Sequence, residues 1–133
     1  MAVEKESKKV AWIIDDDPIA RLLIKRTLER TKYYGFFEEF SDGVDFISKL
    51  KVSENLEFPK PDLVLLDINM PQKDGWEVLD FIAKEDIKFE NCIIVVLTSS
   101  INPRDKKKAF SYKHVSGFLN KPLKQDDVKS LNI

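Results

Sequence analysis

Residues 62–67 have the sequence DLVLLD, in which four consecutive apolar residues stand between two aspartates. An apolar run of this length predicts a strand that is covered on both faces, as in a parallel sheet. Asp67 is the first charged residue after the run, and ligands of open α/β sheets bind outside the carboxyl ends of strands. Asp67 is therefore the first candidate site residue, although an aspartate that merely caps a strand would give the same pattern.

The composition is that of one globular domain. The 133 residues are 43% hydrophobic and 34% charged, as in ordinary folded domains. The formal net charge of −1 gives no bulk attraction to nucleic acid, and no apolar run is long enough to span a membrane. Cys92 is the one cysteine, which excludes an internal disulfide and fits a reducing cytoplasm. We expect a charged N-terminal extension at 1–9, without a signal-peptide core, and one domain over 10–133.

Predicted strands and helices alternate along this domain. The predicted strands are 10–14, 36–40, 63–66, 92–97 and 115–119. The predicted helices are 18–31, 44–52, 76–82, a lysine-rich helix opened by Asn102–Pro103, and a short helix at 124–131. This alternation predicts a parallel sheet with right-handed crossovers. Five such units indicate an open, doubly wound α/β sheet, because a barrel would need eight.

Local signals define the helix faces and ends. Asp17 is the predicted N-cap of the first helix, and Pro18 is suited to its first turn. Ala109 and Phe110 are the expected buried points of the lysine-rich helix, and residues 33–35 are expected to break the pattern before the second strand. Helical spacing along the first helix is shown by Ile19, Leu22, Leu23 and Leu28.

Chemically active residues follow four of the predicted strands. Asp15 and Asp16 follow the first strand, Asp67 the third, Thr98 the fourth and Lys121 the fifth. Parallel strands bring these ends to one edge of the sheet, where the three carboxylates would repel one another unless a cation neutralised them. A hard divalent ion such as Mg²⁺ suits such a set of oxygens. An acidic pair that only favours the dipole of the first helix is the simpler alternative.

The same constellation is suited to phosphoryl transfer. A carboxylate attacks phosphorus to form an aspartyl phosphate, and Asp67 is the candidate nucleophile. Lys121 offers a compact positive charge for a phosphate oxygen, and Thr98 offers a hydroxyl donor. Positioning and charge neutralisation supply most of the catalysis in this reaction.

From residue 10 to residue 131 the chain resembles the receiver (response regulator) domains of two-component signalling, of the single-domain chemotaxis-regulator type. Each matching motif is short, but their order and spacing together are highly specific. The motifs are IDDDP at 14–18, LDINMP at 66–71 with DG at 74–75, LTS at 97–99, and FLNKP at 118–122. The resemblance implies a flavodoxin-like (βα)5 fold, with a parallel five-stranded sheet of order 2-1-3-4-5.

The resemblance also implies how the site would work. Asp67 would accept a phosphoryl group from a histidine kinase or a histidine phosphotransfer protein. Mg²⁺ would be held by Asp16 directly, by Asp15 through water, by Asp67, and by the backbone carbonyl of Asn69. The chain would catalyse only its own aspartyl phosphorylation and dephosphorylation, and would pass the signal to a protein target that the sequence does not name.

The remaining implied roles concern the switch. Lys121 and Thr98 would contact the phosphoryl oxygens, and Phe118 would turn inward when Thr98 moves toward the phosphate. The Lys121–Pro122 peptide bond is expected to be cis. The output surface would comprise the fourth helix, the fifth strand and the fifth helix.

The chain departs from the commonest family pattern at several positions. Ser99 stands where alanine is usual, Phe118 stands where tyrosine is frequent, and the loop at 53–61 looks longer than usual. Asn69 and Ser100 occupy positions at which family members tune water access to the aspartyl phosphate. None of these departures removes a residue that the phosphoryl chemistry requires.

Three other functions share part of this pattern. A phosphatase of the haloacid-dehalogenase type, also dependent on Mg²⁺, would need an acid two residues after the nucleophile, where this chain has Asn69, and a cap insertion. A flavodoxin would need a hydroxyl-rich and glycine-rich phosphate loop, where this chain has acids at 15–17. A receiver-like interaction module that is never phosphorylated usually lacks one of the acids or the lysine, all of which are present here; it stays the main alternative.

Overall fold

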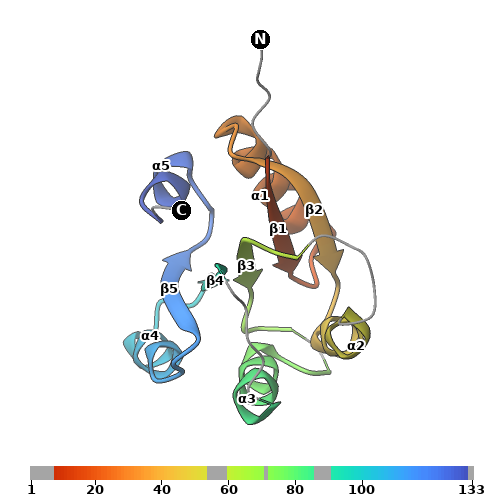
Figure 1. Cartoon of the computed structure of the whole chain (residues 1–133). Coiled ribbons are helices and arrows are strands. Elements are labelled where there is room, and N and C mark those ends of the chain that lie inside the picture. The colour runs from red at the N-terminus through yellow and green to blue at the C-terminus, as the bar shows by residue number, and fades with distance from the viewer. Residues whose placement is uncertain (1–7, 54–59, 71, 86–90, 132–133) are drawn as a thin grey trace.

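The computed structural model describes residues 8–53, 60–70, 72–85 and 91–131. Its five strands are all parallel and lie in the order β2-β1-β3-β4-β5 (Figure 1). This confirms the predicted flavodoxin-like sheet. Along the chain the elements are β1 (Lys9–Ile14), α1 (Pro18–Arg30), β2 (Tyr34–Phe40), α2 (Gly43–Ser53), β3 (Leu63–Leu66), α3 (Gly75–Glu85), β4 (Ile93–Thr98), α4 (Pro103–Phe110), β5 (Val115–Asn120) and α5 (Gln125–Lys129).

Helices cover the sheet on both faces and create two apolar cores. One core lies between the sheet and α1 with α5, through residues such as Leu28 and Val128. The other lies between the sheet and α2, α3 and α4, through residues such as Phe46, Leu79 and Ala109. Figure 1 shows the two layers, with α1 and α5 on one side of the strands and α2, α3 and α4 on the other.

Successive residues of the central strands point alternately into the two cores. In β3 all four residues are buried, as the uninterrupted apolar run predicts. Leu65 packs into the α1 side, whereas Leu66 packs into the α2 side. Ile14 of β1 is the register partner of Leu66, so the two strands end level with each other. This alignment brings the residues that follow, Asp15 and Asp67, to the same edge of the sheet.

Helix α1 begins as predicted but turns a different face to the sheet. The side chain of Asp17 caps it by accepting a hydrogen bond from the backbone N–H of Ile19 at 2.9 Å. Ile24 and Leu28, one turn apart, are its buried residues. The other apolar positions stay in solvent, with exposed fractions of 66% for Ile19, 43% for Leu22 and 54% for Leu23. Periodicity therefore predicts the helix correctly, but three of the four apolar residues that show the predicted helical spacing face solvent.

Strand β2 starts earlier than the sequence predicts. We expected residues 33–35 to break the pattern, but Tyr34 and Gly35 belong to the strand, and Tyr34 is buried. The pairing shifts by one residue here, because Lys9 pairs with Tyr34 while Val10 pairs with Phe36. A β-bulge of this kind leaves Gly35 unpaired. A Cβ atom on Gly35 would lie 2.7 Å from Cβ of Lys8, so a larger residue would not fit without a shift.

Some of the predicted segments fall on residues that the structure does not describe. The predicted extension at 1–9 falls largely outside them, as does most of the predicted loop at 53–61, and Pro71 is also outside. In the lysine-rich helix Ala109 is buried as predicted, but Phe110 is 47% exposed, which corrects that expectation. Among the described residues, no helix is both long enough and apolar enough to cross a membrane.

Candidate functional site

Three carboxylates meet at the carboxyl edge of the sheet. Asp15 follows β1, Asp67 follows β3, and both are almost fully buried, whereas Asp16 is exposed. One carboxylate oxygen from each of the three lies within 4.8 Å of the others. The sequence-based prediction that these acids would lie together is therefore correct as geometry. Hard oxygen donors at this spacing are the ligands that a divalent cation such as Mg²⁺ prefers.

Backbone hydrogen bonds between the strands fix the two buried acids. The N–H of Asp67 donates to the carbonyl of Ile14 at 3.0 Å, and the N–H of Asp15 donates to the carbonyl of Phe40 at 3.0 Å. Each acid is therefore the first residue beyond its strand and is still held by the neighbouring strand. The carboxylates are aimed by the sheet and do not depend on a loose loop.

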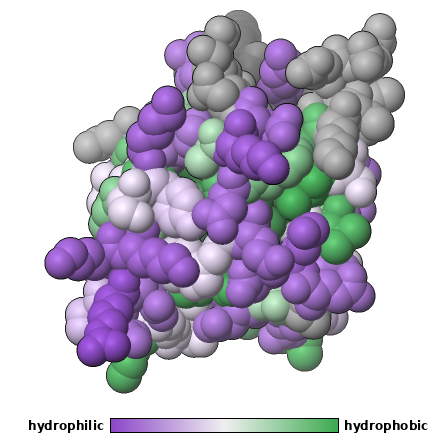
Figure 2. Space-filling view, turned by 90° about the horizontal axis from the view of Figure 1, so that it is seen from below, coloured by the Kyte–Doolittle hydropathy of each residue, from purple (hydrophilic) through white to green (hydrophobic). Residues whose placement is uncertain are grey.

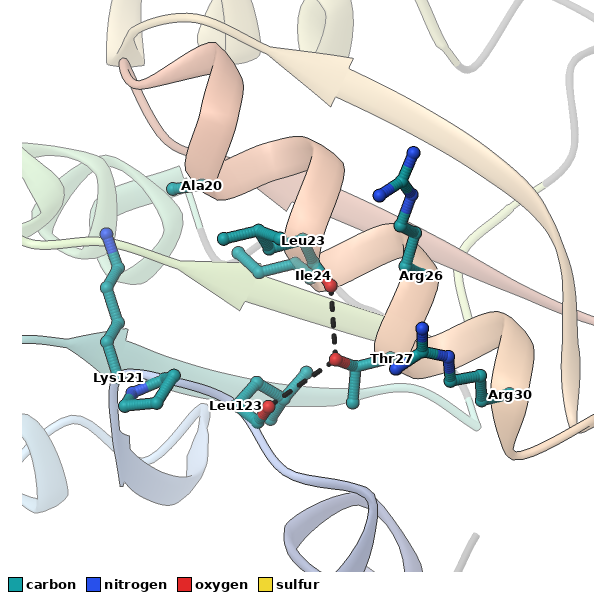
Figure 3. Close-up of a pocket in the computed structure, with 9 residues that line it drawn as sticks. Ala20, Leu23, Ile24, Arg26, Thr27, Arg30, Lys121 and Leu123 are labelled. Carbon is teal, nitrogen blue, oxygen red and sulfur yellow. Dashed lines mark hydrogen bonds between the residues drawn. The ribbon is translucent and has the colours of Figure 1, made fainter.

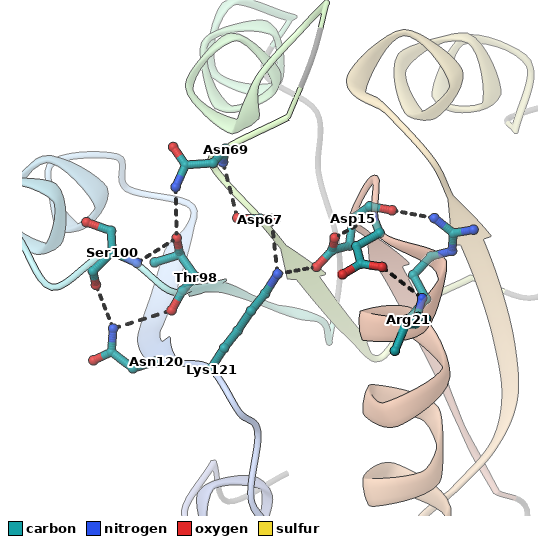
Figure 4. A network of polar contacts seen from close by, with 10 residues as sticks. Asp15, Arg21, Asp67, Asn69, Thr98, Ser100, Asn120 and Lys121 are labelled. Carbon is teal, nitrogen blue, oxygen red and sulfur yellow. Dashed lines mark hydrogen bonds and ion pairs between the residues drawn. The ribbon is translucent and has the colours of Figure 1, made fainter.

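Lys121 lies between the two buried acids. Its Nζ is 2.5 Å from Oδ2 of Asp15 and 3.1 Å from Oδ2 of Asp67. Its backbone N–H donates to the carbonyl of Thr98 at 2.9 Å, and the Lys121–Pro122 peptide bond is cis, as predicted. Figure 4 shows the lysine side chain reaching from the end of β5 to the gap between Asp67 and Asp15.

Burial and charge act in opposite directions on these groups. Burial raises the pKa of Asp67, and the N–H of Asn69 and the charge of Lys121 offset this rise only in part. For Lys121, burial acts to lower the pKa, but the hydrogen bond to Asp15 and the charge of Asp67 outweigh it, so the pKa is raised. The ammonium group thus stays charged in a partly desolvated pocket, where its attraction for an anion is strong.

Thr98 and Asn69 form the polar wall of the site. Thr98 is fully buried at the end of β4, and its Oγ1 accepts hydrogen bonds from the backbone N–H of Ser100 at 3.2 Å and from Nδ2 of Asn69 at 3.5 Å. The backbone N–H of Asn69 donates to Oδ1 of Asp67 at 3.1 Å. Asn69 therefore links the carboxylate of Asp67 to the hydroxyl of Thr98. The sequence did not predict the contact between the side chains of Asn69 and Thr98.

Asn120 has a role at this edge of the sheet that the sequence did not predict. Its Nδ2 donates to the carbonyl of Ser100 at 2.7 Å and to that of Thr98 at 3.4 Å. It thereby ties the end of β5 to the segment between β4 and α4. A polar residue directly before Lys121 was the available signal, but the partners of an amide cannot be read from sequence.

Arg21 also has a role that the sequence did not predict. From the second turn of α1, its Nη1 donates to the backbone carbonyl of Asp15 at 2.5 Å, and its Nε pairs with Oε1 of Glu39 at 2.9 Å. Lys25 pairs with the other oxygen of Glu39 at 2.9 Å. This arrangement braces the turn that carries Asp15 against the edge strand β2, as Figure 4 shows for Arg21 and Asp15.

The remaining predicted residue, Phe118, is half-buried in β5 and packs against the core on the α4 side.

On the opposite side of the sheet an open groove of about 500 Å³ runs between α1 and the segment after β5. Leu23, Ile24 and Leu123 give it an apolar lining, Arg26 and Arg30 stand along α1, and Lys121 lies at one end, as Figure 3 shows.

A doubly wound parallel sheet with a lysine-bridged acidic cluster at its carboxyl edge defines an α/β domain of the flavodoxin-like type. Residues 11–131 match the response regulator receiver domain family, and the chain belongs to that family. The expected resemblance is thereby confirmed, and the chain is a receiver domain of two-component response regulators.

Individual relatives agree with this assignment. The chain is 33% identical to a probable methanogenesis regulatory protein, FilR2, of Methanothrix harundinacea, over 96% of this chain and 81% of that one. It is 30% identical to the response regulator Rcp1 of Synechocystis, over 96% and 86% of the two chains.

Solved structures have the same fold. A two-component response regulator from Cytophaga hutchinsonii superposes with a TM-score of 0.83 at 29% identity, covering 94% of this chain and 95% of that one. The Mn²⁺-bound form of Rcp1 superposes with a TM-score of 0.72 at 30% identity, covering 92% and 88%.

Proposed function

We propose that this protein is the phosphoacceptor of a two-component phosphorelay, in which Asp67 receives a phosphoryl group from the phosphohistidine of a kinase or phosphotransfer protein. The observation that carries the proposal is the position of Lys121, whose Nζ lies within 3.1 Å of the carboxylates of both Asp15 and Asp67. A fixed cation beside a buried carboxylate is the arrangement that stabilises charge on a transferring phosphoryl group.

We assign a Mg²⁺ site to Asp15, Asp16 and Asp67, with the backbone carbonyl of Asn69 as a further ligand. The donor set fits the ion, because three carboxylates converge within 4.8 Å and one of them, on Asp16, is open to solvent. The related protein Rcp1 has been solved in a Mn²⁺-bound form, which supports the proposal that this chain binds a divalent ion. When bound, the ion would supply positive charge beside the phosphoryl oxygens.

In the proposed reaction a carboxylate oxygen of Asp67 attacks the donor phosphorus in line. The P–N bond breaks, and its electron pair returns to the imidazole nitrogen of the donor, which is then reprotonated from solvent. Lys121 neutralises the oxygens of the transferring group, and the hydroxyl of Thr98 donates a hydrogen bond to one of them. Hydrolysis of the resulting aspartyl phosphate resets Asp67.

The switch is proposed to start at Thr98. Its Oγ1 is presently engaged by Ser100 and Asn69, so a move toward a phosphoryl oxygen would alter the segment that leads into α4. Phe118 is half-buried and would move inward into the space that Thr98 leaves. Phosphorylation would thus shift the population toward a different surface of α4, β5 and α5.

The groove along α1 supports a docked protein donor. Part of its apolar lining lies on α1, which also carries the exposed side chains of Ile19, Leu22 and Leu23, and Lys121 of the acidic site stands at the end of the groove. A donor helix lying there would hold its phosphohistidine near Asp67.

We further propose that the protein is cytoplasmic, with an extension at 1–9 and the receiver domain at 10–133. Its chemistry is limited to its own phosphorylation and dephosphorylation.

The test is the intact mass of the protein after incubation with a small acyl phosphate and Mg²⁺. The expected result is a gain of one base-labile phosphoryl group, absent without Mg²⁺ and absent in Asp67→Asn. Asp126→Asn, which changes an exposed acid of α5, is the matched control and should be modified normally. A folded wild type that gains no phosphoryl group, also from phosphorylated donor proteins, would support the phosphorylation-independent interaction module instead.

A further inference from the structure

Asp15 is held at four points in the turn that joins β1 to α1. Its backbone N–H donates to the carbonyl of Phe40 at 3.0 Å, and its Oδ1 accepts a hydrogen bond from the N–H of Asp17 at 2.9 Å. Its Oδ2 pairs with Nζ of Lys121, and its backbone carbonyl accepts a hydrogen bond from Nη1 of Arg21 at 2.5 Å. Both the backbone and the side chain of Asp15 are therefore fixed.

Asp16, the next residue, has no such contacts of its own. Its side chain is exposed and makes no hydrogen bond or ion pair within the part of the chain that the structure describes. One of its carboxylate oxygens nevertheless lies within 4.8 Å of oxygens of Asp15 and Asp67. The direction of this side chain depends on the Asp15–Asp16 peptide group, which is planar and whose carbonyl Arg21 holds.

Arg21 is in turn held by the edge strand β2. Its Nε pairs with Oε1 of Glu39 at 2.9 Å, and Lys25 pairs with the other oxygen of Glu39. Only 16% of the Arg21 side chain is exposed. A guanidinium group presents its N–H donors in a rigid fork, so one part of it can bind Glu39 while another binds the carbonyl of Asp15. The turn that carries the acids is thus tied to the sheet through one side chain.

These contacts lie on the side of the sheet that α1 covers. Figure 2 shows the molecule from the other side, where α3 and α4 lie, and hydrophilic side chains dominate the surface there. Substitutions of Arg21 or Lys25 leave that surface unaltered, because both residues belong to α1. A change in metal binding by such a variant can therefore be attributed to the turn after β1.

We infer that Arg21 is a positioning residue of the metal site, which holds the Asp15–Asp16 peptide group so that the carboxylate of Asp16 faces the other two acids. The inference rests on the proposed function, because it gives Arg21 a part in the Mg²⁺ site assigned above. Replacement of a residue that orients metal ligands typically weakens metal binding by about 10- to 100-fold.

Two other roles of Arg21 predict different results. A cation near three carboxylates repels Mg²⁺, so an effect of charge alone would make the ion bind more tightly when Arg21 is replaced by a neutral residue. A brace that only stabilises the fold would lower the free energy of unfolding and leave the affinity of the folded protein for Mg²⁺ unchanged. The sign of the change in affinity therefore separates positioning from both.

The test measures the dissociation constant of Mg²⁺ by titration calorimetry on the full chain, with urea unfolding in the absence of the ion as the check on folding. Arg21→Met and Arg21→Lys should both bind Mg²⁺ about tenfold more weakly than the wild type. Arg21→Lys keeps the charge but loses the fork, and it carries the test if Arg21→Met does not fold. Lys25→Met is the matched control. It removes the same charge and the other ion pair of Glu39, and should stay within about twofold of the wild type.

The phosphorylation assay with the small acyl phosphate gives a second measurement. The Mg²⁺ concentration that gives half the maximal rate should rise by the same factor in both Arg21 variants. Their deficit in rate should shrink as Mg²⁺ approaches saturation, because the substitution weakens binding of the ion and leaves Asp67 and Lys121 in place.

The calorimetry decides the inference separately from the proposed function, because the intact mass of the same samples reports phosphorylation. Weaker Mg²⁺ binding by both Arg21 variants, with normal binding by Lys25→Met, supports the inference; a wild type that then gains no phosphoryl group would count against the proposed function alone. Equal or tighter binding by either Arg21 variant overturns the inference, as does equal weakening in Lys25→Met. A wild type that binds no Mg²⁺ also overturns it, whatever its intact mass shows.

Discussion

Nζ of Lys121 lies 3.1 Å from Oδ2 of Asp67, although 54 positions separate the two residues in the chain. The same ammonium group contacts Asp15, from the first strand. One lysine therefore balances two carboxylates that are almost fully removed from water. Because two buried like charges repel strongly, the lysine is needed for stability as well as for the proposed chemistry.

Replacing Lys121 by methionine tests this balance. Without the ammonium group, Asp15 and Asp67 face each other uncompensated, and we expect Lys121→Met to lower the free energy of unfolding by about 3 kcal/mol in the absence of divalent ions. Saturating Mg²⁺ should recover most of this loss, because the ion would replace the missing charge. Denaturant unfolding with and without Mg²⁺ measures both values, and Lys60→Met is the control. An equal loss in both conditions would contradict the shared role.

The close approach of Gly75 to the site gives a second prediction. A Cβ atom at Gly75 would lie 2.5 Å from the carbonyl oxygen of Asp67 and 2.6 Å from Cα of Ile68. Both neighbours are backbone atoms, so Gly75→Ala must displace the turn after β3 or the start of α3. We expect a loss of about 2 kcal/mol in unfolding free energy and weaker Mg²⁺ binding, measured by denaturant unfolding and titration calorimetry. Ala83→Ser, at an exposed position of α3, should leave both unchanged.

Glu39 gives a prediction for the dependence of stability on pH. Burial acts to raise its pKa, but the hydrogen bonds and charges of Lys25 and Arg21 prevail, so the pKa lies below its ordinary value of 4.5. The ion pairs therefore stabilise the fold above that value, and this contribution disappears as pH falls through the lowered pKa. Because the Glu39 side chain is 35% exposed, we expect less than about 1 kcal/mol.

The variant Glu39→Gln tests this prediction by comparison of its unfolding free energy with that of the wild type. It should be less stable than the wild type near pH 7, and the difference should vanish in acid, as measured by urea unfolding at a series of pH values. Asp45→Asn is the control, since no ion pair of Asp45 is found among the described residues. A difference that grows as the pH falls would show that the sign of the assigned shift is wrong.

The single thiol gives a fourth prediction. Burial, and to a lesser extent the charge of Asp62, raises the pKa of Cys92 from 9.0 to about 12. Since the thiolate is the reactive form, alkylation by iodoacetamide at pH 8 should be about a thousandfold slower in the native protein than in denaturant. An added cysteine, Ser48→Cys, lies at an exposed position of α2 and should react rapidly in both states. Rapid native labelling of Cys92 would contradict its assigned environment.

Much of the fold could be predicted because the three central strands, β1, β3 and β4, are marked by apolar runs. Each run is followed by a polar residue, and parallel pairing brings such ends to one edge, so the convergence of Asp15 and Asp67 followed from the parallel pairing of the strands. The cis bond before Pro122 was expected from the family resemblance. These features depend on backbone topology and short motifs, which a sequence states directly.

Other features depend on side-chain packing and could not be predicted. Arg21 and Asn120 act through the backbone carbonyls of Asp15 and Ser100, 6 and 20 positions away, and many polar residues could make such contacts. The exposed apolar residues of α1 follow the helical period, but the period does not say which face meets the sheet. The bulge at Gly35 shifts the register by one residue, and local propensity carries no signal for that shift.

The arrangement of helices on both faces of the sheet also separates the two encounters proposed for this protein. The groove along α1 opens on one face, whereas α4 belongs to the opposite face. A donor seated in the groove would leave α4 uncovered, so the part of the output surface that lies on α4 stays accessible to the target. A ternary complex is then sterically allowed, and a target could be waiting on the receiver at the moment the phosphoryl group arrives.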